Sequence, residues 1–142
     1  MNEIKDIKEI KLDATVENIA KVTEFVDAQL EECGCPMKAQ MQIDIAIDEL
    51  FGNIAHYAYN PEVGPATVQV EVRREPEIEV IITFIDNGIP YDPLAKEDPD
   101  VTLSAEERGI GGLGIYMVKK SMDEIVYEYK DGQNILKVRK KI

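Results

Sequence analysis

The sequence predicts an α+β protein, a two-layer sandwich whose mixed, mostly antiparallel sheet carries three helices on one face. Apolar residues recur at helical spacing within the early stretches 13–34 and 37–59. Apolar and polar residues alternate within 68–84 and 125–142 instead, as they do in half-buried strands. Because the two helical stretches are grouped ahead of most strands, an antiparallel sheet is expected and not a parallel one.

The first two predicted elements are a strand at 4–12 and the helix that follows it. Asp13 or Thr15 can cap this helix, and Gly34 and Pro36 mark its end. One side of the helix carries Val16, Ile19, Val22, Phe25, Val26 and Leu30.

A second helix is predicted over 37–59. The dipeptide Asn60-Pro61 stops it, because the residue before a proline is biased away from helical dihedrals. Its apolar stripe consists of Ile43, Ile47, Leu50 and Ile54.

The rest of the chain predicts two hairpins separated by a lid and a short helix. The first hairpin turns at Glu75-Pro76, and the segment 86–107 that follows has no periodicity and many acidic residues. A loop of that length in a compact domain is usually functional, and we interpret about 89–111 as a lid. A helix at 113–122 and a hairpin turning at Asp131-Gly132 complete one domain spanning 1–142.

Composition and charge limit the classes of molecule that the chain is expected to bind. The chain has 142 residues, with 16 Lys and Arg against 28 Asp and Glu, and a net charge of -12. This balance repels nucleic-acid backbones and anionic membrane surfaces, so direct nucleic-acid or membrane binding is not expected. No apolar run approaches the roughly 20 residues that span a bilayer, so a cytoplasmic protein is predicted. Cys33 and Cys35 are too few for a disulfide framework or a zinc site.

Glu49 and Asn53 are the first candidate site residues. They lie four residues apart on the second predicted helix and so share one face, away from its apolar stripe. A carboxylate beside a carboxamide suits Mg²⁺, which prefers oxygen ligands, and the carboxylate can also accept a proton. Taken alone, the pair is more typical of a solvated helix face.

Asp86-Asn87-Gly88 follows an apolar strand. This position places a carboxylate at the mouth of a hydrophobic sheet, where it can accept a hydrogen bond from an amino group on a flat ring. Gly88 would let the backbone pass close to that ring. By itself, the tripeptide is also typical of an ordinary turn.

A glycine-rich loop follows Arg108. It holds Gly109, Gly111, Gly112 and Gly114, four glycines in six residues, at the start of a predicted helix. Free backbone N–H groups and the helix dipole there can face phosphates. Neither the dinucleotide nor the Walker fingerprint fits, because no glycine loop follows the first strand and no Gly-Lys-Ser or Gly-Lys-Thr occurs. A flexible lid hinge is the alternative interpretation.

These three segments, in this order, resemble the Bergerat-type ATP-binding fold shared by gyrase, Hsp90, histidine kinases and MutL. Within that group, the stretches DNGIPYDP and ERGIGGLGIYMVKKSMDEIVYEY resemble the stand-alone anti-sigma-factor serine kinases of the GHKL type. The similarity covers about residues 10–140. It implies ATP and Mg²⁺ as cofactors.

The resemblance also implies roles for individual residues. Glu49 corresponds to the general base, Asn53 to the magnesium ligand, and Asp86 to the contact with the adenine amino group. Gly88 lets the adenine approach, and Arg108 resembles the arginine that stabilises charge on the transferring phosphoryl group.

The glycine loop matches the family in part. Gly112 and Gly114, with Leu113 between them, correspond to the phosphate-binding segment, and Gly109 and Gly111 are extra lid glycines. The run is longer than the family's Arg-x-Gly-x-Gly, so Arg108 stands two residues further from Gly112.

A second departure from the family lies near the C-terminus. Many relatives place a threonine beside the adenine pocket, where this chain has Gln133-Asn134-Ile135. Either Asn134 replaces that contact or nothing does.

The activity implied is transfer of the ATP γ-phosphate to a serine of an anti-sigma-factor antagonist. A sigma factor and a second copy of the chain, as a homodimer, are the other implied partners. A nucleotide-gated binding module without phosphotransfer is the alternative function, because a carboxylate at position 49 would also order water around Mg²⁺.

Overall fold

The structure is a computed structural model that describes residues 6–95 and 113–142. The described chain begins and ends with a β-strand, and the helices come at intermediate positions in the sequence. In chain order the elements are β1 (Asp6–Asp13), a 3₁₀ turn (Val16–Asn18), α1 (Ile19–Glu32), α2 (Met37–Asn53), a π-helical turn (Ile54–Ala58), β2 (Pro65–Arg73), β3 (Glu79–Asp86), α4 (Leu113–Ser121), β4 (Glu124–Lys130) and β5 (Gln133–Lys141).

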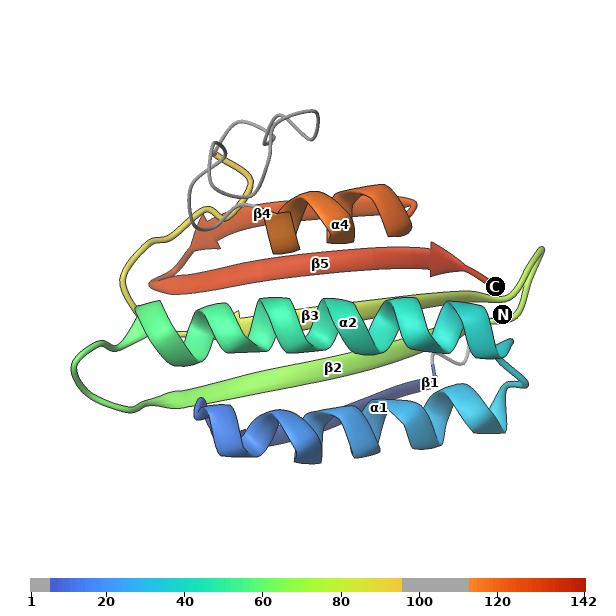
Figure 1. Cartoon of the computed structure of the whole chain (residues 1–142), viewed down its shortest axis with the longest axis horizontal. Helices are drawn as coiled ribbons and strands as arrows, with labels where there is room; N and C mark the ends of the chain where they lie inside the picture. Colours follow the sequence, from blue (N-terminus) through green and yellow to red (C-terminus); the bar gives the residue numbers. More distant parts are fainter. Residues whose placement is uncertain (1–5, 96–112) are drawn as a thin grey trace.

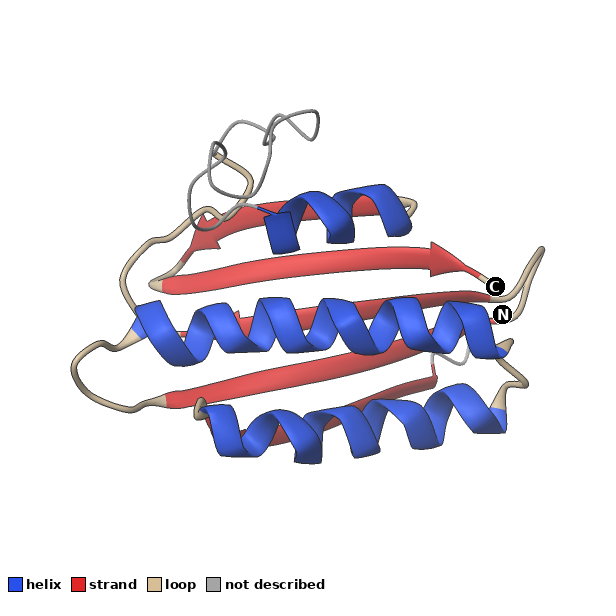
Figure 2. Cartoon of the chain, in the orientation of Figure 1, coloured by secondary structure: helices blue, strands red, loops and turns tan. Residues whose placement is uncertain are grey.

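The described strands form one five-stranded sheet in the order β1-β2-β3-β5-β4. Every neighbouring pair in it is antiparallel. Helices α1, α2 and α4 all lie against the same face, with α2 across the middle (Figures 1 and 2). The predicted two-layer α+β architecture is therefore confirmed, with an antiparallel sheet throughout the described residues.

The ends of the helices agree in part with the capping and stop residues of the sequence. Thr15 accepts a hydrogen bond from the backbone N–H of Asn18, so it caps the 3₁₀ turn that leads into α1. Helix α2 ends at Asn53, and the chain continues through a wider π-helical turn to Ala58. The predicted helix at 37–59 thus carries a distorted last turn, of a kind that is frequent at functional sites.

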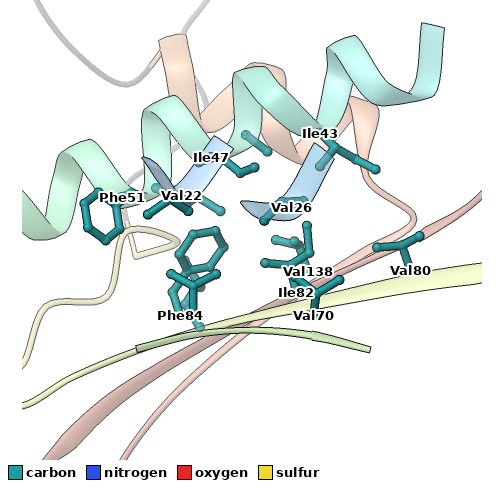
Figure 3. Packing of buried hydrophobic residues seen from close by; sticks show 14 of the residues in the cluster. Val22, Val26, Ile43, Ile47, Phe51, Val70, Val80, Ile82, Phe84 and Val138 are labelled. Carbon is teal, nitrogen blue, oxygen red and sulfur yellow. The ribbon is translucent and has the colours of Figure 1, made fainter. Parts of the chain in front are cut away.

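The core lies between the helices and the sheet. Phe51 of α2 points toward Phe84 of β3, and the two side chains are 0% and 1% exposed (Figure 3). Fully burying an apolar side chain of this size stabilises the fold by about 1.5–3 kcal/mol. The remaining labelled members of the cluster are Val22, Val26, Ile43, Ile47, Val70, Val80, Ile82 and Val138. This packing fixes α2 over the sheet and leaves its other faces available for chemistry.

Two smaller findings concern cysteines and membranes. Cys33 and Cys35 are both free thiols next to the end of α1. Among the residues that the structure describes, no helix is both long enough and apolar enough to cross a membrane.

Candidate nucleotide-binding site

A pocket opens where the end of α2 meets the ends of β3, β4 and β5. It holds about 400 Å³ of space between the lining atoms, counting the part open to solvent. Most of its wall is apolar, with a few polar side chains among the apolar ones. The lining residues are Leu50, Asn53, Ile54, Ala58, Phe84, Asp86, Tyr91, Pro93, Tyr127, Asn134 and Leu136.

Asp86 is the buried carboxylate of this pocket and is only 5% exposed. Its Oδ1 accepts hydrogen bonds from the backbone N–H of Gly88 and from Asn134 Nδ2, each at 2.9 Å. Burial raises the pKa of Asp86, and these two hydrogen bonds oppose that rise. Within the described residues Oδ2 has no partner, so Asp86 retains an acceptor for a donor group on a ligand.

The turn after β3 is attached to the π-helical turn after α2. The backbone N–H of Ile89 donates to the Ala58 carbonyl at 3.0 Å, and that of Asn87 donates to the Tyr59 hydroxyl at 2.8 Å. A Cβ at Gly88 would overlap the Ala58 carbonyl. Glycine is therefore required at this position by a close approach of two backbones.

Asn134 sits at the centre of a hydrogen-bond network beside Asp86. Its Nδ2 donates to Asp86 Oδ1 and, at 2.8 Å, to the Ile89 carbonyl. Its Oδ1 accepts from the backbone N–H of Tyr91 at 3.1 Å and from the Tyr127 hydroxyl. Both donors and both acceptor positions of the amide are in use.

The pairing of β3 with β5 explains why Asp86 and Asn134 meet. They are directly opposed in the antiparallel register, although 48 positions separate them in the chain. A slip of one residue would turn one of the two side chains to the other face of the sheet.

Glu49 and Asn53 lie together on α2, as predicted, and both are half-buried. Asn53 lines the pocket. The pKa of Glu49 is raised, first by burial and then by the negative charge of Asp48, while a hydrogen bond with the Asn53 side chain lowers it. A carboxylate whose pKa moves toward neutrality is a better match to a general base.

Helix α4 begins at Leu113, directly beside Glu49. A Cβ at Gly114 would overlap the Glu49 carboxylate, so the first turn of α4 lies against that group. Of the predicted site, Glu49, Asn53 and Gly114 thus form one end, and Asp86, Gly88 and Asn134 form the other. Arg108, Gly109, Gly111 and Gly112 lie outside the described residues, as does the lid beyond position 95.

Tyr91, Pro93 and Tyr127 also line the pocket. They stand within the two stretches that carry the family resemblance, but no site role was predicted for them. A weak signal for Tyr127 was present in the sequence, because this aromatic residue with a hydroxyl occupies an alternating position of the last predicted hairpin. Tyr91 had no local signal. Its ring stacks on Tyr57 with centroids 5.3 Å apart, a contact between a loop and the π-helical turn.

The pocket offers one protein oxygen donor to the Mg²⁺ that the family resemblance implies. Within the described part of the chain, no group of three His, Cys, Asp or Glu side chains is placed to hold a metal ion. Mg²⁺ usually binds through one or two protein oxygens, with waters and substrate phosphates completing its shell. The Asn53 carboxamide, beside Glu49 and lining the pocket, is an oxygen donor of that kind.

Comparison with known protein families identifies the fold and the ligand class. The family described as "Histidine kinase-like ATPase domain" matches residues 12–140. The chain belongs to this family. An ATPase domain of this kind implies ATP as the ligand, and the resemblance inferred from the three motifs is confirmed.

Proteins named as serine or serine/threonine kinases are similar to this chain over most of its length. The serine/threonine-protein kinase BtrW of Bordetella bronchiseptica is 28% identical over 99 residues, covering 70% of this chain and 68% of the relative. The serine-protein kinase RsbW of Bacillus cereus (strain ATCC 10987) is 27% identical over 132 residues, covering 90% and 81%.

A solved structure has the same fold. The RsbU and RsbW domains of Rv1364c from Mycobacterium tuberculosis match with a TM-score of 0.61 and 19% identity. The match covers 94% of this chain but 32% of that one, so this chain spans about a third of the solved protein. At this identity the likeness concerns the fold alone.

Proposed function

We propose that this histidine kinase-like ATPase domain is a protein-serine kinase dependent on Mg-ATP. It transfers the γ-phosphate of ATP to a serine of an anti-sigma-factor antagonist and binds a sigma factor in alternation with that antagonist. The observation that carries the proposal is the contact between Glu49 and the first turn of α4. This contact places a carboxylate of raised pKa at the N-terminal end of a helix, where phosphates bind.

Adenine would occupy the apolar part of the pocket. Asp86 Oδ2, the oxygen without a partner in the described residues, would accept from the exocyclic amino group of the base. Gly88 supports this pose because the chain there is already in contact with Ala58 and offers no side chain to the ring.

Glu49 would act as the general base. It would take the proton of the acceptor serine hydroxyl as the serine oxygen forms a bond to the γ-phosphorus. The bond from that phosphorus to the oxygen bridging to the β-phosphate breaks, so ADP leaves with the electron pair. The products are ADP, phosphoserine and a protonated Glu49, which returns its proton to solvent.

Asn53 would hold the magnesium ion together with the nucleotide phosphates. When bound, the ion neutralises phosphate charge. The remaining phosphate contacts are assigned to Gly112, Leu113 and Gly114, with Gly109 and Gly111 in the lid, and Arg108 would stabilise charge on the transferring group.

The protein partners follow from the resemblance to the anti-sigma-factor kinases. The relative BtrW is named as a serine/threonine kinase and the relative RsbW as a serine kinase, which supports a serine acceptor. The net charge of -12 is compatible with protein partners and unfavourable for nucleic acid. A homodimer is proposed on the same resemblance.

A phosphotransfer assay tests the proposal. Labelled ATP is incubated with wild type, Glu49→Gln or Glu31→Gln, and with candidate antagonist proteins from the same genome. Glu31 is an exposed carboxylate on α1 and serves as the matched control. We expect labelling of one antagonist by wild type and Glu31→Gln, and a loss of at least about 100-fold with Glu49→Gln.

Binding measurements separate activity from nucleotide recognition. If ATP binds and no antagonist is labelled, the kinase assignment fails and a nucleotide-gated binding module stands. Asn53→Ala should abolish the magnesium dependence of ATP affinity, and an unchanged dependence would contradict the metal assignment.

A further inference from the structure

Asn134 lies beside the proposed adenine position but has no hydrogen-bonding capacity left for a base. All four of its bonds are made within the protein, to Asp86, Ile89, Tyr91 and Tyr127. A direct contact with a ligand would require one of these bonds to break inside a buried site, since Asn134 is 6% exposed. A broken bond there leaves a buried group unsatisfied, which is costly.

The orientation of the amide is determined by its neighbours. The Ile89 carbonyl can only accept, so it requires the NH₂ group of Asn134, and the Tyr91 N–H can only donate, so it requires the oxygen. The Tyr127 hydroxyl donates to the same oxygen. The amide therefore presents a donor, and never an acceptor, to Asp86.

That donor selects which oxygen of Asp86 is available. Asp86 Oδ1 receives both the Asn134 amide and the Gly88 N–H, and this pair of bonds sets the plane of the carboxylate. Oδ2 is then the acceptor that remains for the pocket. Losing the amide would leave only the Gly88 N–H on Oδ1, so the carboxylate would rotate more freely and the preference between its two oxygens would weaken.

We propose that Asn134, held by Tyr127, is a positioning residue that sets adenine specificity by orienting Asp86, without touching the nucleotide. The proposal deepens the function given above and rests on it. The same amide also holds the Ile89 carbonyl and the Tyr91 N–H, so the segment that follows β3 is tied to β4 and β5 through one side chain.

The test compares two ligands that differ by one group. ADP and purine riboside diphosphate, which lacks the exocyclic amino group, are titrated by calorimetry with Mg²⁺ into each variant. The ratio of their dissociation constants measures the amino-group contact. For wild type we expect a ratio of roughly 10 to 100, the effect of one hydrogen bond to a charged group.

The variants are Asn134→Ala, Tyr127→Phe and the control Tyr129→Phe. Tyr129 lies on the same strand, and no hydrogen bond of its hydroxyl to Asn134 is present in the structure. We expect the ratio to fall below about 3 for Asn134→Ala, to fall by about threefold for Tyr127→Phe, and to stay at the wild-type value for Tyr129→Phe.

Each result has a defined meaning. If wild type binds neither diphosphate, the proposed function itself fails. If wild type discriminates and the two network variants keep the wild-type ratio, or weaken both ligands equally, Asn134 is only structural and the inference is overturned. Should Asn134→Ala fail to fold, Tyr127→Phe decides the question, since it removes one hydroxyl and leaves the ring in place.

Discussion

The two ends of the pocket are built differently. At the Asp86 end, backbone meets backbone, because a Cβ at Gly88 would overlap the Ala58 carbonyl. At the Glu49 end, a helix meets a side chain, because a Cβ at Gly114 would overlap the Glu49 carboxylate. The turn after β3 is held by backbone hydrogen bonds and cannot shift easily, whereas the Glu49 side chain can rotate.

This difference indicates where the site is preorganised. Hydrogen bonds from a turn, two strands and a loop determine the Asp86 end before any ligand arrives, which suits recognition of a rigid base. The Glu49 side chain keeps rotational freedom, which suits its proposed role as a base for an acceptor hydroxyl on another protein.

The largest expected effect concerns the identity of the base. In Asp86→Asn, the new amide would keep its oxygen toward Gly88 and Asn134 and turn its NH₂ toward the pocket. ADP affinity should fall by about 30- to 100-fold, while inosine diphosphate, which has a carbonyl in place of the amino group, should bind better than it does to wild type. Calorimetry with ADP and inosine diphosphate measures this change in preference. Equal losses of affinity for both ligands would show that Asp86 does not contact the exocyclic amino group.

The next effect tests the rigidity of the Asp86 end. Gly88→Ala should lower the free energy of unfolding by about 2 kcal/mol, because the methyl group must displace the Ala58 backbone. Urea unfolding measures it. Gly52→Ala on α2 is the matched control, since a Cβ there meets only Ile19 at an ordinary 3.8 Å, and it should be neutral or slightly stabilising.

The same substitution at the other end should behave differently. Gly114→Ala should cost less than about 1 kcal/mol of stability, because the Glu49 side chain can move aside. Phosphotransfer should nevertheless fall about tenfold, since the displaced carboxylate no longer faces the acceptor. If Gly114→Ala destabilises the protein as much as Gly88→Ala, the two ends are equally rigid and the comparison fails.

The smallest effect concerns a carboxylate buried without an amide partner. Asp44 of α2 faces Asp27 of α1, and the Oδ1 atom of each is buried without a hydrogen-bond partner in the described residues. Burial, followed by the hydrogen bond and charge of Asp27, raises the pKa of Asp44 to about 7. Asp86 differs from Asp44 in this respect, because its hydrogen-bond partners are the Asn134 amide and the backbone N–H of Gly88 and not a second carboxylate.

The pH dependence of stability follows from the sign of that shift. The folded pKa of Asp44 lies above its unfolded value, so its stabilising contribution is fully present below about pH 4 and is lost as the pH rises through about 7. Asp44→Asn should therefore gain about 1 kcal/mol over wild type at pH 8 and less at pH 5, after allowance for solvent screening.

Urea unfolding at several pH values checks this result. Glu24→Gln, an exposed change on α1, should keep the wild-type pH profile. An unchanged profile in Asp44→Asn would mean that the two carboxylates do not share a proton.

Local patterns in the sequence determined much of this protein. Helical spacing on α2 placed Glu49 and Asn53 on one face and outside the core, and alternation placed the two hairpins that supply four of the five described strands. These signals are readable because each depends on residues only a few positions apart. The same property made the three motifs recognisable as those of an ATP-binding fold.

Tertiary structure alone decided how the Asp86 end is assembled. The β3–β5 register brings Asn134 opposite Asp86, and β4 and the segment after β3 add Tyr127 and Tyr91 to the same network. No short turn joins β3 to β5, so their register is decided by which faces of the two strands pack beneath α2 in the folded sheet. The sequence could therefore name Asp86 and Asn134 separately, and only the folded sheet made them partners.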